Sequence, residues 1–508
     1  MQLFRTKSVE QTIAETGEEG RKLKRSLTWW DLSIMGVAVA VGAGIFSVGA
    51  QAAAFHAGPA VIISFLIAGI VCGAAVMCYA EFASMIPVAG SAYTFTYTTV
   101  GELTAWIIGW DLILEMLFAG SVIAKYWGVY LNDFIRLMGW NVNTDLALGS
   151  FNFDLAPIII VAFFTVLLVF GTKIGARVDG AMTVLKIAIV VFVVIVGFFY
   201  VKASNFTPFI PPSQPAAATT GDGAVSAQMA QPLWQWATGM TPSIYGVPGI
   251  LSGAALVFFA FLGFDVVATA SEETKNPHKN VPLGIGVGML LIIVMYMLVA
   301  IVTTGMVSYK DLAKQDSPSL ATAFELVGAD WAAKIISFGI VLGLATVIMV
   351  LLLGLTRIVF AMSRDGLLPR GLSKTGKHGT PAVLQIVVGV VVALVAALFD
   401  IGVLSDMVNI GTLSAFTLVA ISIPIMRKKR PELPRAFRMP GNPCVPILIA
   451  LANFWLMLNL SVLTWIRFLV WLVIGFAIYF SYGYWHARLG KGDLSETLSD
   501  ETDRAVNG

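Results

Sequence analysis

Charged residues are scarce in this 508-residue chain, where Asp, Glu, Lys and Arg together make up 12% of the sequence. A typical soluble domain has roughly 25%. Only three cysteines and four histidines are present. Cys72, Cys78 and Cys444 lie in or near apolar runs without the spacing of metal ligands or a disulfide framework, and no zinc or nucleophile motif includes a histidine. The composition therefore argues against a soluble domain and predicts neither a metal site nor a cofactor.

Long apolar stretches take the place of the missing charge. Hydrophobic residues make up 57% of the chain, and runs such as "AVIISFLIAGIVCGAAVMCYA" exceed the ~20 residues that cross a bilayer as a helix. This pattern predicts an all-α polytopic membrane protein. The third and eighth spans are long enough to tilt or to extend beyond the bilayer. We expect twelve transmembrane helices, near residues 29–53, 60–86, 102–132, 154–171, 180–202, 248–271, 282–307, 329–362, 380–399, 403–426, 443–463 and 465–487.

The basic residues of the loops predict the orientation, because cytoplasmic loops carry an excess of Lys and Arg. The segments "RKLKR", "KIGARVD", "TKNPHKN", "RDGLLPRGLSKTGK" and "RKKRPELPRAFR" all fall on one side if the spans alternate. We therefore expect a multi-pass protein of the cell membrane with both termini in the cytoplasm. The segment before the first span is too charged and too long for a cleavable signal peptide.

Polar segments flank the predicted membrane domain of residues 29–487. Residues 1–28 form a cytoplasmic N-terminal segment, and the acidic tail of residues 488–508 has the composition of a disordered segment. The one long outer segment, between residues 202 and 247, is rich in Pro, Ala, Gly and Thr and is expected to be a surface loop. No feature of the chain predicts a nucleic acid partner or indicates an oligomeric state.

Two spans carry small or polar residues where a lipid-facing helix would be uniformly apolar. The first reads "VAVGAGIFSV" over residues 39–48, and the sixth reads "FFAFLGFD" over residues 258–265. Interrupted helices in corresponding positions are typical of inverted-repeat transporters with a site at mid-membrane. We therefore expect a five-plus-five inverted repeat, with repeat one over residues 29–202 and repeat two over residues 248–426. The last two helices, over residues 443–487, are appended to it.

The two interruptions offer complementary backbone groups. If the first helix unwinds at Gly42, Ala43 and Gly44, its amides and the following helix N-terminus suit a carboxylate. The alternative is that these small residues only let another helix approach closely. In the sixth span, open carbonyls around Phe259, Ala260 and Leu262 would accept hydrogen bonds from an ammonium group. The neighbouring phenylalanines would wall off the site, or would simply pack in the core.

Three charged residues within the spans are expected to couple or gate transport, because an acid or base at this depth is costly and usually faces a partner or water. Asp265 follows the sixth-span interruption, and Glu115 lies near mid-membrane in the third span. Lys186 lies about 10 Å into the fifth span at 1.5 Å per residue. It is either a titratable cation in a cavity or a side chain that extends back to the cytoplasmic surface. Glu115 and Lys186 together suggest a proton-linked pair.

Six motifs resemble those of the amino acid–polyamine–organocation superfamily, in the same order. They are "VGAGIF", "YAEFASMIPVAGSAYTFTYTTVGE", "AWIIGWDLILE", "FFAFLGFDVVATASEETKNPHKNVPLGI", "TRIVFAMSRDGLLP" and "RPELPRAFRMPGNPCVP". "GWDLILE" and "RDGLLP" are most similar to the bacterial cationic amino acid transporter branch, and the resemblance covers residues 25–490. It implies the leucine-transporter-type fold and amino acid transport by alternating access. It also implies that Lys186 stands where sodium-coupled relatives hold an ion, which would make the protein proton-coupled.

Two positions bear on specificity. Many relatives have Ser or Thr where this chain has Ala43, so a hydroxyl contact to the substrate is missing. Leu344 falls where the eighth span would approach the ligand's side chain, and it favours a neutral or apolar side chain over a cationic one. The sequence thus predicts a secondary importer of amino acids, by proton symport. The first alternative is an amino acid/amine exchanger. A receptor or a membrane enzyme is less favoured, and the sequence has no HExxH, GxSxG or P-loop motif that would indicate an enzyme.

Overall fold

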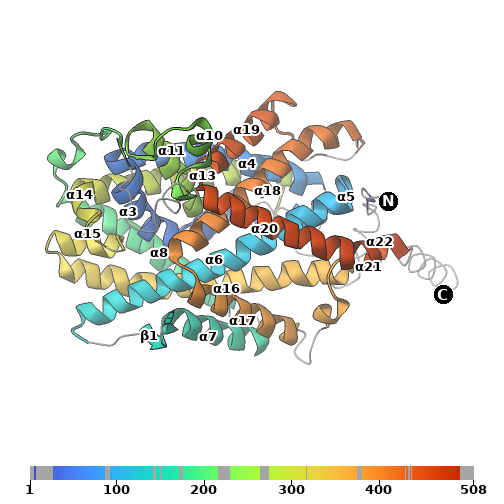
Figure 1. Ribbon diagram of the computed structural model, residues 1–508, viewed down its shortest axis with the longest axis horizontal. Coiled ribbons are helices and arrows are strands. Elements are labelled where there is room, and N and C mark those ends of the chain that lie inside the picture. The colour runs from blue at the N-terminus through green and yellow to red at the C-terminus, as the bar shows by residue number, and fades with distance from the viewer. Residues whose placement is uncertain are drawn as a thin grey trace.

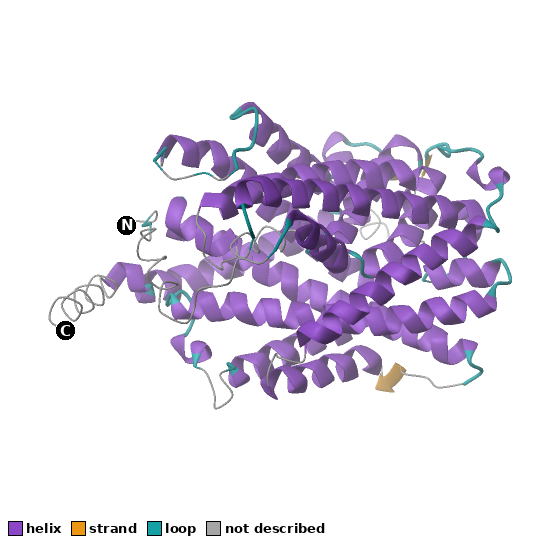
Figure 2. Cartoon of the chain, turned by 180° about the vertical axis from the view of Figure 1, so that it is seen from behind, coloured by secondary structure: helices purple, strands orange, loops and turns teal. Residues whose placement is uncertain are grey.

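The computed structural model describes residues 5–6, 27–85, 92–140, 145–148, 151–170, 175–215, 229–263, 274–315, 317–374, 380–429, 431–432, 435 and 437–491. The described chain is a helical bundle in which most helices run along the long axis of the molecule (Figures 1 and 2). α14 and α15 lie at one end of the bundle, and α5, α21 and α22 lie at the other (Figure 1). The expected all-helical membrane domain is therefore the main feature of the structure.

The helices follow the predicted spans closely. The α-helices of the first half are α2 (Trp29–Ala40), α3 (Gly49–Ala52), α4 (Val61–Met85), α5 (Ala92–Thr99), α6 (Glu102–Leu137), α7 (Leu155–Phe170) and α8 (Gly175–Phe198). Those of the second half are α10 (Leu233–Thr238), α11 (Gly246–Val257), α13 (Pro277–Met306), α14 (Tyr309–Leu312), α15 (Leu320–Leu326), α16 (Asp330–Arg364), α17 (Ala382–Leu398), α18 (Ile401–Lys429), α19 (Cys444–Leu458), α20 (Val462–Ile478), α21 (Tyr484–His486) and α22 (Arg488–Lys491).

Tighter and wider helical turns interrupt or extend some of these elements. The π-helical segments are η1 (Gly44–Val48), η2 (Ala53–Ala57) and η8 (Tyr479–Gly483). The 3₁₀ segments are η3 (Gly58–Ala60), η4 (Ala203–Phe206), η5 (Phe258–Phe261) and η7 (Arg370–Ser373). Two small antiparallel pairs, β1 (Asp145–Leu148) with β2 (Phe151–Asp154) and β3 (Gln214–Pro215) with β4 (Ser243–Ile244), lie in the loops. The outer loop predicted between residues 202 and 247 thus contains short elements of its own.

Six helical segments of the described chain are long and apolar enough to cross a membrane: Gly44–Glu81, Glu102–Leu137, Lys279–Met306, Asp330–Arg364, Ile401–Lys429 and Val462–His486. Shorter apolar helices lie at Leu155–Phe170, Met182–Phe198, Gly246–Phe261, Ala382–Leu398 and Cys444–Leu458. The chain is therefore a multi-pass membrane protein. α6 and α16 are the longest helices, with 36 and 35 residues. At 1.5 Å per residue both exceed the ~30 Å hydrocarbon core.

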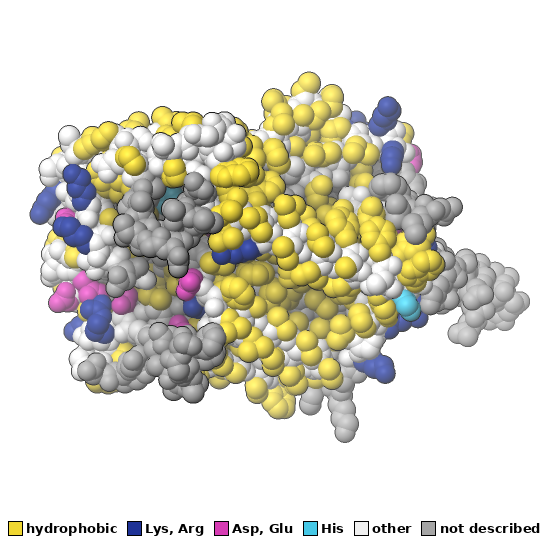
Figure 3. All heavy atoms as spheres, in the orientation of Figure 1, with side chains coloured by type: hydrophobic (Ala, Val, Ile, Leu, Met, Phe, Trp, Pro, Cys, Tyr) yellow, Lys and Arg dark blue, Asp and Glu magenta, His cyan; other side chains and the backbone are white. Residues whose placement is uncertain are grey.

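The surface agrees with this assignment. Hydrophobic side chains cover the middle of the face shown in Figure 3, and most charged side chains gather toward its two ends. Large apolar side chains such as Phe163 on α7 and Val473 on α20 are more than half exposed. Apolar patches of this extent are rare on soluble monomers, and in a bilayer lipid tails cover them.

The centre of the bundle is built on α6, which packs against α16 and α18 and also contacts α5, α7 and α17. α8 packs against α13 and α16, and α2 lies against α13 (Figure 1). Two predicted spans are not continuous helices. The first is divided between α2 and η1, and the sixth passes from α11 into η5 and ends its described part at Gly263.

Candidate functional site

The first predicted span is interrupted at the glycine stretch. α2 ends at Ala40, and Val41 has an extended backbone with φ −70° and ψ 93°. The chain returns to helical geometry at Ala43 and continues as the π-helix η1. A helix leaves its last four carbonyls without partners within the helix. The break therefore leaves carbonyl groups at the end of α2 and amides at the start of η1 without partners in their own helices.

The sixth predicted span is interrupted in the same way. η5 ends at Phe261, Leu262 is extended with ψ 143°, and Gly263 has a φ of +82°. Only glycine adopts this left-handed conformation readily, so "LG" is the sequence signal of the break. The carbonyl of Phe259 accepts the N–H of Leu262 at 3.2 Å and so closes the last turn. Asp265 lies outside the described residues.

The two interruptions meet. A Cβ added to Gly44 would fall 2.2 Å from the Cα of Ala260, which is too close for two carbon atoms that are not bonded to each other. Gly44 therefore lets η1 and η5 approach closely. This close helix contact is the second of the two roles that the sequence allowed for the small residues. Gly42 differs, because a Cβ added there would come no nearer than 3.9 Å to the Ala40 carbonyl oxygen. The stretch thus combines an interrupted helix with a tight helix contact.

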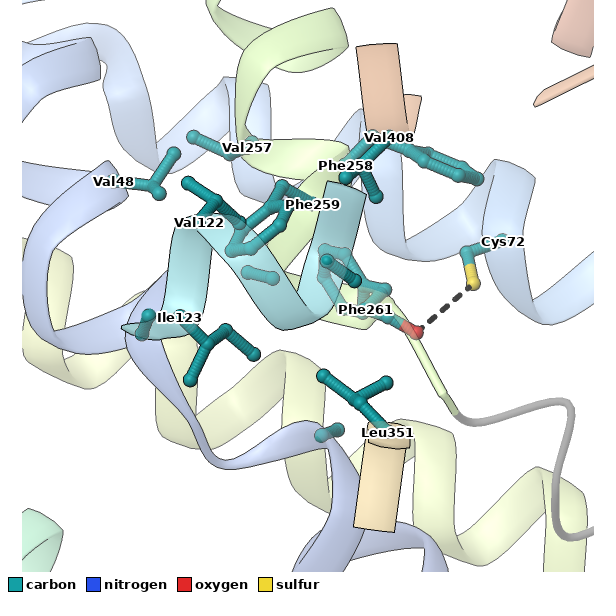
Figure 4. Packing of buried hydrophobic residues seen from close by; sticks show 14 of the residues in the cluster. Val48, Cys72, Val122, Ile123, Val257, Phe258, Phe259, Phe261, Leu351 and Val408 are labelled. Carbon is teal, nitrogen blue, oxygen red and sulfur yellow. Dashed lines mark hydrogen bonds between the residues drawn. The ribbon is translucent and has the colours of Figure 1, made fainter. Parts of the chain in front are cut away.

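The phenylalanines of η5 belong to the packed core (Figure 4). Phe258, Phe259 and Phe261 are buried among side chains of four helices. These neighbours are Cys72 of α4, Val122 and Ile123 of α6, Leu351 of α16 and Val408 of α18. The Cys72 thiol donates to the carbonyl oxygen of Phe261, with 4.0 Å between sulfur and oxygen. The rings therefore hold the broken helix rigidly in place.

Lys186 lies beside the first interruption. Its ammonium Nζ donates to the carbonyl of Ala38 at 2.8 Å, in the last turn of α2. The residue is 1% exposed, and its stem packs on Gly343 of α16, where an added Cβ would be 2.7 Å from Lys186 Cγ. The alternative that Lys186 extends to the cytoplasmic surface is therefore wrong. The lysine instead joins α8, α2 and α16 at the helix break.

Glu115 is 1% exposed and lies on α6, the helix that packs against α16 and α18. One turn earlier, Asp111 accepts a hydrogen bond from the Ser414 hydroxyl of α18 at 2.8 Å. The ion pairs that join described residues do not include one between Glu115 and Lys186. The expected proton-linked pair is thus not a direct contact in this structure.

Tyr296 of α13 was not anticipated from the sequence. Its hydroxyl lies 2.6 Å from the carbonyl oxygen of Ala40 and 2.7 Å from that of Ala260, so it touches both broken helices. The residue is fully buried. The only signal in the sequence is a single hydroxyl in the otherwise apolar run "GMLLIIVMYMLVAIV".

Space near the interruptions is limited. Leu344 of α16 is fully buried next to Gly343. A pocket bounded by Tyr296, Phe46 and Phe65 has a volume of about 10 Å³, close to the minimum for one water molecule. Among the described residues, no group of three or more His, Cys, Asp or Glu could hold a metal ion. The arrangement offers backbone carbonyls, backbone amides and one ammonium group, held by rigid apolar packing.

Comparisons with known proteins agree with this architecture. The family model described as amino acid permease matches residues 27–482. The chain is 42% identical to the branched-chain amino acid permease BcaP of Bacillus subtilis (strain 168), over 96% of this chain and 99% of that protein. It is 39% identical to the methylthioribose transporter of the same organism, with the same coverage. It is 36% identical to cationic amino acid transporter 3, mitochondrial, of Arabidopsis thaliana, over 82% of this chain and 64% of that protein.

These proteins are named as transporters and permeases, and none is named as an enzyme. The matched region includes both interrupted helices and Lys186. The chain therefore belongs to the amino acid permease family, within the amino acid–polyamine–organocation superfamily, and is a membrane transporter rather than an enzyme.

Proposed function

We propose that this protein imports a neutral amino acid with an apolar side chain across the cell membrane by alternating access, in symport with a proton. The observation that carries the proposal is the meeting of the two interrupted helices at Gly44 and Ala260, next to a buried lysine. Backbone that leaves the helix at this depth is tolerated only where it is buried in protein or lines a cavity. A ligand with both a carboxylate and an ammonium group matches its free amides and carbonyls.

In this proposal the amides around Gly42, Ala43 and Gly44 bind the carboxylate. The ammonium group is bound by carbonyls of the sixth span. Of the three residues expected to supply them, Ala260 is the one whose carbonyl meets the end of α2, through the hydroxyl of Tyr296. The 10 Å³ pocket bounded by Tyr296, Phe46 and Phe65 is too small for an amino acid, and we propose that the helices separate to admit one.

Lys186 is proposed to carry the coupling proton. Its hydrogen bond to Ala38 links the charge of the ammonium to the end of α2, where the helix dipole is negative. Loss of the proton removes the charge from this hydrogen bond and so weakens the hold of Lys186 on α2. Glu115 and Asp265 are proposed as further coupling or gating groups, acting through water or through other conformations.

The proposed substrate class rests on Leu344 and the η5 phenylalanines as an apolar subsite. The name of the branched-chain permease at 42% identity supports it. The proposed topology has twelve spans, the five-plus-five inverted repeat and cytoplasmic termini. The equivalent positions of the two interruptions, in the first and sixth spans, support that repeat.

Reconstitution tests the proposal. Purified protein in liposomes should accumulate labelled leucine, isoleucine or valine when the outside is acidic, with or without sodium. Accumulation that needs sodium and ignores pH would contradict proton symport. Exchange that is fast without a pH gradient and requires internal amino acid would instead favour an exchanger.

A second substrate class has a specific observation behind it. The methylthioribose transporter is almost as similar to this chain as the branched-chain permease, at 39% identity. Methylthioribose has no carboxylate and no ammonium group, so it would not use the backbone groups in the proposed way. A thermal-shift screen with both classes of ligand discriminates between them, because a ligand stabilises the folded state that binds it.

A further inference from the structure

Two helix ends of the same polarity converge at Tyr296. The Ala40 carbonyl ends α2, and the Ala260 carbonyl lies in η5 at the end of the α11 segment. Both are C-terminal ends, which carry a partial negative charge. Their oxygens lie within 2.6 and 2.7 Å of the same hydroxyl oxygen. This joint therefore brings two acceptors together at the single hydroxyl donor of Tyr296.

One hydroxyl cannot satisfy both carbonyls at once. A tyrosine O–H has a single proton to donate and lone pairs to accept with. At any moment one of the two short contacts therefore brings two oxygen atoms together without a proton between them. A further N–H group at this point would relieve the repulsion, by donating to one carbonyl and to the hydroxyl oxygen.

The hydroxyl is held firmly where it lies. The ring of Tyr296 packs edge-on against Phe65 of α4, with 5.6 Å between centroids, and tilted against Phe261 of η5 at 5.1 Å. The residue is fully buried, and its backbone lies in the middle of the 30-residue helix α13. The ring cannot swing away from the joint without disturbing this packing.

We propose that Tyr296 is a positioning residue for the ammonium group of the substrate. It holds the Ala40 and Ala260 carbonyls at one point, and the ammonium group supplies the donor that the joint lacks. In the bound state the hydroxyl donates to one carbonyl, while the ammonium donates to the other and to the hydroxyl oxygen. This inference rests on the proposed function, because it requires a substrate with an ammonium group.

The test compares two tyrosine variants with two ligands. Tyr296→Phe removes the hydroxyl and keeps the ring. Tyr130→Phe is the matched control, because the Tyr130 hydroxyl is also fully buried and donates to a carbonyl of the first span, that of Phe46 at 2.6 Å, rather than to Ala40 or Ala260. The ligands are L-leucine and its deaminated analogue 4-methylpentanoate, and the readouts are the Kd of each and the KM and Vmax of leucine uptake.

Tyr296→Phe is expected to raise the Kd and KM for leucine about tenfold, the cost of about one hydrogen bond to a charged group. Its Vmax and its Kd for 4-methylpentanoate should stay within twofold of wild type. Tyr130→Phe should change neither ligand's Kd by more than twofold. An equal loss for both ligands, a fall in Vmax alone, or no change in Tyr296→Phe would overturn the inference.

A second variant covers the case in which Tyr296→Phe does not fold. 4-Aminophenylalanine at position 296 keeps the ring and provides N–H donors to both carbonyls, so it should fold, but it should bind leucine about tenfold more weakly because the joint no longer needs the donor that the ammonium group supplies. Leucine binding within twofold of wild type by this variant would overturn the positioning role. A wild-type protein that binds no amino acid at all would overturn the proposed function and this inference with it.

Discussion

Gly44 of η1 and Ala260 of η5 lie in direct backbone contact, 216 positions apart in the sequence. A Cβ on Gly44 would also fall 2.9 Å from the backbone nitrogen of Ala260, so the obstruction is main chain and not a movable side chain. The contact joins the two interrupted helices where the substrate is proposed to bind. Because only Gly44 makes this contact, mutations of Gly42 and of Gly44 should have different effects.

Gly44→Ala is expected to destabilise the protein, because the added methyl group forces η1 and η5 apart. Overpacking of this kind costs about 1–3 kcal/mol. Thermal unfolding in detergent should show a lower melting temperature, and uptake should fall with it.

Gly42→Ala is the matched control, since its methyl group meets nothing closer than 3.9 Å. It should leave the melting temperature nearly unchanged and weaken substrate binding, because the Cβ enters the space where the carboxylate is proposed to lie. A stable Gly44→Ala protein with normal uptake would contradict the close contact. Normal binding by Gly42→Ala would contradict the backbone site at that residue.

The helix breaks could be predicted from the sequence because they are local. Glycine at positions 42, 44 and 263 within apolar runs is costly in a helix and marks an interruption. The depth of Lys186 could also be predicted, by counting residues from the polar loop that precedes the fifth span. The residues that contact each of these positions in the folded protein could not be predicted from the local sequence.

Tyr296 shows why. Its role depends on Ala40 and Ala260 lying together, and a single tyrosine in an apolar helix is more often a packing residue. Likewise, the sequence left open whether Gly44 marks a helix interruption or a close helix contact, and only the position of Ala260 shows the contact. Contacts between residues more than two hundred positions apart leave no periodic signal in one sequence.

The buried ion pair between Glu81 and Arg427 gives a second prediction. The Glu81 carboxylate, at the end of α4, accepts from Nε and Nη2 of Arg427 at 2.8 and 2.6 Å, and from the Met439 N–H at 2.7 Å. Glu81 is fully buried and also lies 3.7 Å from Nε of Arg435, so removing it takes the counter-charge from two guanidinium groups. Glu81→Ala should lower the unfolding free energy by about 3 kcal/mol, measured by thermal or denaturant unfolding in detergent.

The pair of Arg136 and Glu325 provides the comparison, with 2.9 Å between Nη2 and Oε1 and 59% of the arginine side chain exposed. Glu325→Ala should cost less than about 1 kcal/mol, because exposed ion pairs contribute little. Replacing both partners of this pair, with Glu81→Leu and Arg427→Met, should recover only part of the lost stability, because Arg435, 3% exposed and 3.7 Å from Glu81, also loses the carboxylate. Equal costs for Glu81→Ala and Glu325→Ala would show that burial does not set the strength of the first pair.

The third prediction concerns selectivity. Leu344 is fully buried one residue after Gly343, the contact of Lys186, so a ligand side chain that reaches it meets apolar surface and a nearby ammonium group. A cationic side chain would be left without a partner there. Leucine, isoleucine and valine should therefore raise the melting temperature of the purified protein more than lysine or arginine at the same concentration. A dominant shift with arginine would refute the apolar subsite.

The last prediction concerns coupling through Lys186. Methionine keeps most of the length and volume of the lysine stem, which packs on Gly343, but it can neither titrate nor donate to the Ala38 carbonyl. Lys186→Met should therefore lose accumulation driven by an acidic exterior, while the Kd for leucine changes less than tenfold, because the proposed binding groups lie on the first and sixth spans. Uptake into liposomes with and without an imposed proton gradient measures the first effect, and thermal shift measures the second. Lys125→Met, ten residues after Glu115 on α6, removes a charge that is not part of the proposed site and should retain pH-driven uptake. If Lys186→Met still accumulates leucine against its gradient when the outside is acidic, the lysine does not carry the proton.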